Sequence, residues 1–108
     1  MSLPDIHKND VGVELVIEFV DEDGVVIDIS TASTKQILLR KPGAAAVAKT
    51  GVFDTDGSDG LLKYTTTKVG SVYDLDRAGQ WQIQGFAVIG TNEWHTKVNT
   101  FEVAGNLN

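Results

Sequence analysis

QWQIQGFAVI at residues 80–89 and EWHTKVNTFEV at residues 93–103 flank the short turn Gly90-Thr91-Asn92. The first segment alternates apolar and polar side chains at the period of two that a half-buried β-strand requires. The second segment returns after the turn with a similar alternation. The two segments therefore predict a β-hairpin, and one face of its first strand carries Trp81, Ile83, Ala87 and Ile89.

The apolar face of the second segment changes parity within its length. A shift of one residue turns every following side chain of a strand to the other face. A β-bulge inserts one such residue, so we predict a bulge near Asn99 or Thr100. The two faces that it separates are Trp94, Thr96 and Val98 before the change and Phe101 and Val103 after it.

The rest of the chain also divides into short β-strand patterns. Thirty of the 108 residues are Val, Ile or Thr, and these residues favour strands over helices. Turn-forming clusters recur roughly every 8 to 12 residues, which is typical of β-sandwiches and barrels. Asp54–Gly60 is expected to be a loop, and Val69–Asp76 a connection with room for a short helical turn. The expected strands are Val11–Val20, Val25–Ile29, Lys35–Lys41, Val47–Phe53 and Leu61–Thr67.

Length and composition exclude several classes of protein. The chain of 108 residues is long enough for one domain only. It has no cysteine, which excludes disulfide scaffolds, thiolate zinc sites and cysteine nucleophiles. Its formal net charge of −6 argues against nucleic acid or an anionic membrane as a partner. No apolar run approaches the ~20 residues of a membrane span, and we expect no signal peptide.

Asp76-Arg77-Ala78-Gly79-Gln80-Trp81 leads into the longest strand pattern. This run is similar to the corner that enters the penultimate strand of immunoglobulin-like domains, where an acidic residue and an Ala-Gly turn precede an aromatic residue. The resemblance places Trp81 where those domains usually carry Tyr, and Ile83 where disulfide-bonded members carry Cys. Asp76, Ala78, Gly79 and Trp81 are therefore expected to form a structural corner, in which Asp76 accepts backbone N–H bonds.

Several short motifs follow one another along the chain: residues 9–12, 27–30, 40–43, Thr55-Asp56 with Gly60, residues 78–81 and residues 100–103. Their order over residues 9–103 resembles immunoglobulin-like domains of tailed phages and prophages, of the kind at the start of baseplate upper proteins. The resemblance implies an all-β, immunoglobulin-like β-sandwich of about seven to eight mostly antiparallel strands. We assign residues 1–10 to a flexible amino-terminal arm, 11–104 to the sandwich domain and 105–108 to a carboxy-terminal tail.

The acidic loop 54–60 is the strongest candidate for a metal site. Calcium prefers several carboxylates within a short flexible turn, which Asp54, Asp56 and Asp59 could supply. The EF-hand pattern fails here, because its sixth place from Asp54 needs Gly and its twelfth needs Glu. We favour the other interpretation, a solvated loop of good turn formers, and therefore predict no metal site. A metal-assisted hydrolase would have only these three carboxylates as its active site, with no nucleophile or base beside them. We predict no cofactor.

The sequence favours a protein that is not an enzyme. A catalytic histidine needs a positioned nucleophile and an orienting carboxylate, whereas His7 and His95, the only histidines, are expected in the flexible arm and on the outward face of the last strand. No dinucleotide-binding, phosphate-binding, zinc-protease or nucleophile-elbow motif occurs. We therefore expect surface histidines and no catalytic residues.

The expected function is binding to other proteins. The resemblance implies a non-enzymatic structural protein of a phage tail or baseplate, located in the virion and assembled in the bacterial cytoplasm. Its partners would be other phage structural proteins or copies of itself, with no nucleic acid and no membrane. An adhesion or carbohydrate-binding module is the alternative, which would use Trp94 with Tyr64 or Tyr73 as a platform. The candidate contact residues are Trp94, His95, Lys97, Lys41 and Pro42.

Overall fold

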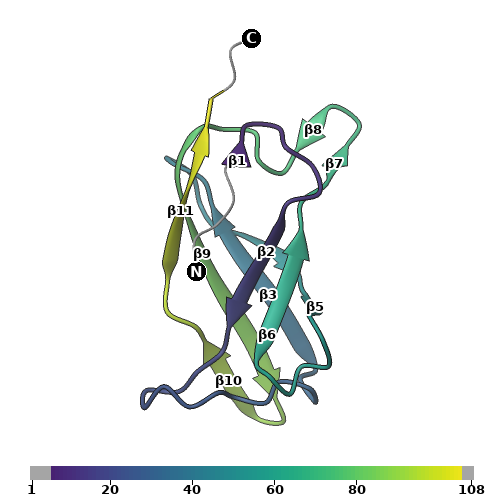
Figure 1. Ribbon diagram of the computed structural model, residues 1–108, viewed down its shortest axis with the longest axis vertical. Helices are drawn as coiled ribbons and strands as arrows, with labels where there is room; N and C mark the ends of the chain where they lie inside the picture. The colour runs from purple at the N-terminus through teal and green to yellow at the C-terminus, as the bar shows by residue number, and fades with distance from the viewer. Residues whose placement is uncertain (1–5, 106–108) are drawn as a thin grey trace.

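A computed structural model describes residues 6–105 and shows an all-β fold, as expected, with no helix among these residues (Figure 1). It has eleven strands, of which four have only two residues and seven are longer, against the expected seven to eight. Apart from one parallel pair, the strands pair in the antiparallel direction. The strands are β1 (Ile6–His7), β2 (Glu14–Glu18), β3 (Thr34–Arg40), β4 (Val47–Thr50), β5 (Val52–Phe53), β6 (Leu61–Thr65), β7 (Lys68–Val69), β8 (Val72–Tyr73), β9 (Gly79–Ile89), β10 (Asn92–His95) and β11 (Asn99–Ala104).

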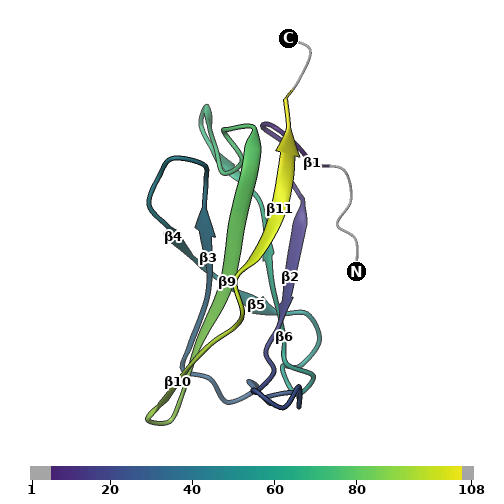
Figure 2. The same cartoon turned by 90° about the vertical axis from the view of Figure 1, so that its left-hand side faces the viewer.

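Two sheets enclose one hydrophobic core. The larger sheet has the order β1-β11-β9-β3-β4, with β10 paired to the second half of β9, and the smaller has the order β2-β6-β5. Figure 2 shows the layer of β2 and β6 beside that of β3 and β9. The alternation along the strands supplies the core from both layers. The largest fully buried side chains are Phe19, Leu15, Ile29, Ile37, Leu62, Leu75, Val103 and Thr66.

The segment predicted as one strand, Val47–Phe53, belongs to both sheets. β4 pairs with β3 in the larger sheet, whereas β5 pairs with β6 in the smaller one. Gly51 lies at the change of sheet, where a Cβ atom would approach Leu62 to 2.7 Å. The absence of a side chain therefore lets the backbone pass close to the core as the chain crosses between the layers.

The predicted β-bulge exists, but it lies slightly earlier than Asn99. His95 is opposite Phe86, whereas Asn99 is opposite Ile83, so the second strand gains one residue between these pairs. The buried Thr96 stabilises this shift. Its Oγ1 accepts a hydrogen bond of 2.8 Å from the Gly85 N–H and donates one of 3.0 Å to the next carbonyl along the chain.

Part of the predicted amino-terminal arm belongs to the larger sheet. Ile6 and His7 pair in parallel with Val103 and Ala104, and Ile6 is buried. A strand of two residues shows no periodic pattern in the sequence. It forms here because Ile6 is buried in the core. Residues 1–5 and 106–108, which complete the predicted arm and tail, lie outside the described residues.

Two connections differ from the sequence expectation. Val25–Ile29 is not a strand, because only a single bridge joins Val26 to Val20. Ile29 instead enters the core and its N–H donates to the Gly57 carbonyl at 2.9 Å. The stretch 69–76 contains most of the hairpin of β7 and β8 and no helical turn, since Val69 pairs with Val72, and Lys68 with Tyr73, across a tight turn.

Gly85→Ala should destabilise the protein by about 1–3 kcal/mol, because an added methyl group overfills a packed core. Its Cβ would lie 2.7 Å from Cζ of Phe19 and 3.0 Å from Cγ2 of Thr96. Urea unfolding measures the loss. Gly105→Ala is the control, since the nearest atom to its added Cβ is 3.9 Å away. Equal stability of the two variants would show that the close contact of Gly85 with Phe19 and Thr96 does not require glycine.

Candidate interaction surfaces

Three of the predicted contact residues lie near the outer edge of β10. Trp94 is half-buried, is opposite Ala87 and packs against the core. His95 is exposed, and its ring lies 4.7 Å from the Phe86 ring between centroids. Lys97 is exposed in the bulge. These three residues lie along one strand edge, which we call the β10 surface, with Trp94 on the core face of the sheet and His95 on the other face.

The other two predicted contact residues lie at the opposite end of β9. Lys41 Nζ is 3.2 Å from a carboxylate oxygen of Asp76, and the Pro42 carbonyl accepts a hydrogen bond of 2.6 Å from Arg77. Pro42 also lies against Gly79, where a Cβ atom would be 2.9 Å from its ring. Gly79 is eight residues from Ala87 along β9, roughly 26 Å at the rise of an extended strand. The five candidates therefore form two separate groups.

The predicted corner is built around the Trp81 side chain. Its Nε1 donates a hydrogen bond of 2.9 Å to the Arg77 carbonyl, four residues earlier. Its ring stacks on Phe101 at 6.0 Å between centroids, so Phe101, and not Trp94, is its aromatic neighbour across the strands. Asp76 takes part through its ion pair with Lys41, where the sequence predicted hydrogen bonds from backbone N–H groups. The exposed Ala78 and the partly buried Gly79 (φ +129°) make the turn.

The three carboxylates of loop 54–60, the candidate for calcium, each have separate local partners. Among residues 6–105 no group of three or more His, Cys, Asp or Glu side chains is arranged to hold a metal ion. Hydrogen bonds from Ser58 lower the pKa of Asp56. Asp54 lies 3.8 Å from Lys63 Nζ, Asp56 accepts bonds of 2.9 and 2.6 Å from Ser58, and Asp59 accepts bonds of 2.6 Å from Thr55 and 3.1 Å from the Leu61 N–H.

A polar cluster surrounds Asp74, and no sequence pattern indicates it. The largely buried carboxylate accepts hydrogen bonds from the Tyr64 hydroxyl and from the Thr67 N–H, the latter at 2.8 Å, and lies 3.2 Å from Lys49 Nζ. Burial raises the pKa of Asp74, but the bonds from Tyr64, Thr67 and Lys49 outweigh it and hold the pKa below its ordinary value of 3.8. The cluster thus ties β4, β6 and the end of β8 together.

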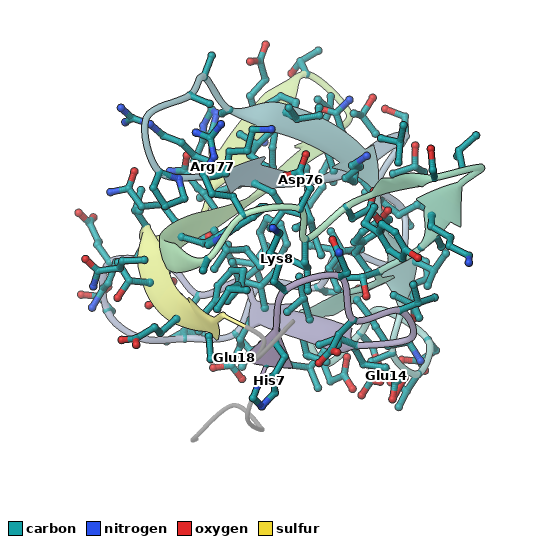
Figure 3. The ribbon with its side chains drawn as sticks, turned by 90° about the horizontal axis from the view of Figure 1, so that it is seen from above. His7, Lys8, Glu14, Glu18, Asp76 and Arg77 are labelled. Atoms are coloured by element: carbon teal, nitrogen blue, oxygen red, sulfur yellow. The ribbon has the colours of Figure 1, made fainter. Side chains whose placement is uncertain are left out.

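A groove that no sequence pattern predicts runs along β2. It has a volume of about 410 Å³ and lies between β2 and the first residues of β11. Glu14 and Glu18 mark the two ends of β2, and Figure 3 shows both on the side of the molecule away from Asp76 and Arg77. The residues that line the groove are Leu15, Val16, Ile17, Glu18, Leu61, Ile83, Asn99 and Thr100.

The β7–β8 hairpin exposes two apolar side chains next to each other. Val69 and Val72 are paired across the turn and are 80% and 68% exposed. Such pairs of β-branched residues stabilise a hairpin, so the two valines need no partner to explain their presence.

Comparisons with known proteins give no assignment: no family model, no curated protein and no solved structure matches the chain. Within residues 6–105, no helix has the length and apolar character needed to cross a membrane.

Asp74→Asn should lower the free energy of unfolding at pH 7 by about 1–3 kcal/mol, the usual range for hydrogen bonds to a charged group. A carboxylate whose folded pKa is lowered stabilises the protein above the unfolded value near 3.8, and this stabilisation is lost as the pH falls through the folded pKa. The difference from the wild type should therefore shrink between pH 4 and pH 2. Urea unfolding across this range measures it, with Glu93→Gln as the exposed control. A constant difference would contradict the role of the charge.

Trp81→Phe should lower the free energy of unfolding by at least about 1 kcal/mol, since the hydrogen bond to Arg77 is lost and the smaller ring fills the buried site less completely. That loss corresponds to a midpoint roughly 4–8 °C lower in thermal unfolding followed by circular dichroism. Trp94→Phe is the matched control, because the half-buried Trp94 indole makes no hydrogen bond within the described residues. A control that falls as far as Trp81→Phe would contradict the hydrogen bond's contribution.

Proposed function

We propose that this protein is an immunoglobulin-like β-sandwich that acts without catalysis, by docking onto neighbouring proteins. The strand order supports this fold. β3, β9 and β11 are neighbours in one sheet, and β2 and β6 are neighbours in the other. In immunoglobulin-like domains strands C, F and G share one sheet and strands B and E share the other. β2, β3, β6, β9 and β11 match strands B, C, E, F and G in chain order.

The Trp81 corner supports the same fold. Immunoglobulin-like domains carry a Tyr near the start of strand F, and its hydroxyl hydrogen-bonds to the backbone a few residues upstream. Trp81 occupies this place in β9 and its indole makes the equivalent bond to the Arg77 carbonyl. Ile83, two residues on, lines the same groove as Leu15 and Ile17 of β2, and in antibody domains a disulfide joins strands B and F at this level.

The distribution of ionisable groups supports a role without catalysis. Of the residues that line the 410 Å³ groove, only Glu18 is ionisable. His95 makes an aromatic contact with Phe86, and the carboxylates of loop 54–60 are engaged by neighbouring hydroxyl, N–H and ammonium groups. A general acid–base mechanism needs two positioned groups on either side of a substrate.

The proposed setting is a phage or prophage particle, in the tail or baseplate. Its support is the order of sequence motifs along residues 9–103 that resembles immunoglobulin-like domains of phage baseplate upper proteins. In this setting the protein would be part of the virion, and its partners would be other structural proteins or copies of itself. The β10 surface is the proposed contact, because its strand edge is open within the described residues and it combines a half-exposed Trp with a Lys.

We expect the protein to copurify with particles induced from the bacterium that encodes it, as measured by mass spectrometry. Lys97→Glu should reduce the amount per particle about tenfold, because it reverses a charge within the proposed contact. Lys68→Glu makes the same charge change on the exposed strand β7 and should have little effect.

A monomeric protein that is absent from purified particles would refute the proposed setting. Binding to a glycan array in that case would favour the alternative, a carbohydrate-binding module. Equal effects of Lys97→Glu and Lys68→Glu would show that the β10 surface is not the contact.

A further inference from the structure

β2 is the open edge of the smaller sheet. Leu15 and Ile17 belong to the alternate positions whose backbone groups face β6, as the bonds Phe19 N–H to Gly60 carbonyl and Thr66 N–H to Val13 carbonyl show. The backbone groups of Glu14, Val16 and Glu18 therefore point the other way. Within the part of the chain that the structure describes, no strand pairs with that side. β1, the nearest strand in chain order, pairs with β11 instead.

The groove beside β2 can receive side chains from an added strand. A strand that pairs with the open edge directs alternate side chains to the two faces of the sheet. One set would enter the 410 Å³ groove, whose inner wall is formed by Leu15, Ile17 and Ile83, all less than 10% exposed. The other set would lie on the outer face beside Glu14, Val16 and Glu18. Main-chain bonds with pockets for alternate side chains are the features of peptide recognition by strand addition.

Charge decides which strand fits. Glu14 and Glu18 are exposed on the outer face at either end of β2, and Lys63 balances only the first, at 3.1 Å. Two copies of β2 paired in the antiparallel direction would set Glu14 of each copy against Glu18 of the other, which is unfavourable. The net charge of −6 opposes self-association further. The edge therefore favours a basic strand over a second copy.

We propose that the open edge of β2 binds an extended segment of a partner protein in which two Lys or Arg residues flank three apolar residues. The basic residues would pair with Glu14 and Glu18, the central residue would lie opposite Val16, and the two between would enter the groove. The pattern is symmetrical, so it fits in either strand direction. This proposal rests on the proposed function and specifies one of its docking surfaces and the chemistry of the partner.

The peptide TKVVVKT, blocked at both ends, is a suitable probe. Titrated into the full chain, it should shift the amide NMR signals of Glu14, Val16 and Glu18 more than those of Leu15 and Ile17, whose N–H groups already face β6. The peptide TEVVVET, with the charges reversed, should not bind. The absence of any saturable shift up to about 5 mM peptide would overturn the proposal. The dissociation constant would then be above the millimolar range, which corresponds to a binding free energy too small for specific recognition.

Val16→Pro tests the strand pairing. It removes one N–H group from the open edge and leaves the bonds to β6 in place, and proline is tolerated on such edges. It should weaken peptide binding at least tenfold. The double variant Glu14→Lys with Glu18→Lys should do the same without a change of backbone, which keeps the test valid if the proline variant does not fold. Its matched control is Glu93→Lys with Glu102→Lys, which makes the same charge change on exposed residues of β10 and β11 and should change affinity less than threefold.

Other occupants of the edge give different results. A dimer in sedimentation that dissociates in Val16→Pro would assign the edge to a second copy and overturn the basic strand. Peptide affinity unchanged in both β2 variants would also overturn the proposal. Particle association that persists in these variants would overturn only the role of β2 there, whereas absence from particles would refute the phage setting and leave the peptide result intact.

Discussion

The contact between the Phe19 ring and the backbone of Gly85 is the constraint on which the two-sheet arrangement depends. Phe19 follows β2 and Gly85 lies in the middle of β9, so this contact joins the smaller sheet to the larger one. Only glycine lets the ring approach so closely. Gly85 also bonds to Thr96 through both its N–H and its carbonyl, which fixes the register just before the bulge. The bulge then turns Phe101 and Val103 of β11 into the core.

The sequence predicts those parts of the fold in which burial follows a local period. β2, β3 and β9 each alternate over five or more residues, and of the inward face predicted for β9, Trp81, Ile83 and Ala87 are buried and Ile89 is partly buried. Two features could not be predicted because they depend on distant partners. The change of sheet at Gly51 depends on the close approach of Leu62. The two residues of β1 show no periodic pattern, and they form a strand because they pair with β11 and Ile6 is buried in the core.

In the candidate surfaces too, contacts between residues close in the sequence are easier to predict than contacts between distant segments. The position of the Trp81 corner was predicted from the resemblance of residues 76–81 to immunoglobulin-like domains, but the bond from the Trp81 indole to Arg77 that forms it was not. The separation of Lys41 from Trp94 was not predicted either, since it follows from the register of β3 and β10 along β9. The Asp74 cluster was hidden for the same reason. Tyr64 and Lys49 come from different strands, and nothing near Asp74 in the sequence indicates that they meet there.

The position of β1 links the stability of the core to the proposed recognition. Because Ile6 and His7 pair with β11, they extend the larger sheet and cannot also cover β2. An uncovered strand edge invites non-specific pairing, and charged residues on such an edge reduce that risk. Glu14 and Glu18 supply these charges, one at each end of a short apolar run. The same two carboxylates that oppose pairing between copies would attract a strand of opposite charge, so protection from self-association and choice of partner would follow from one feature of β2.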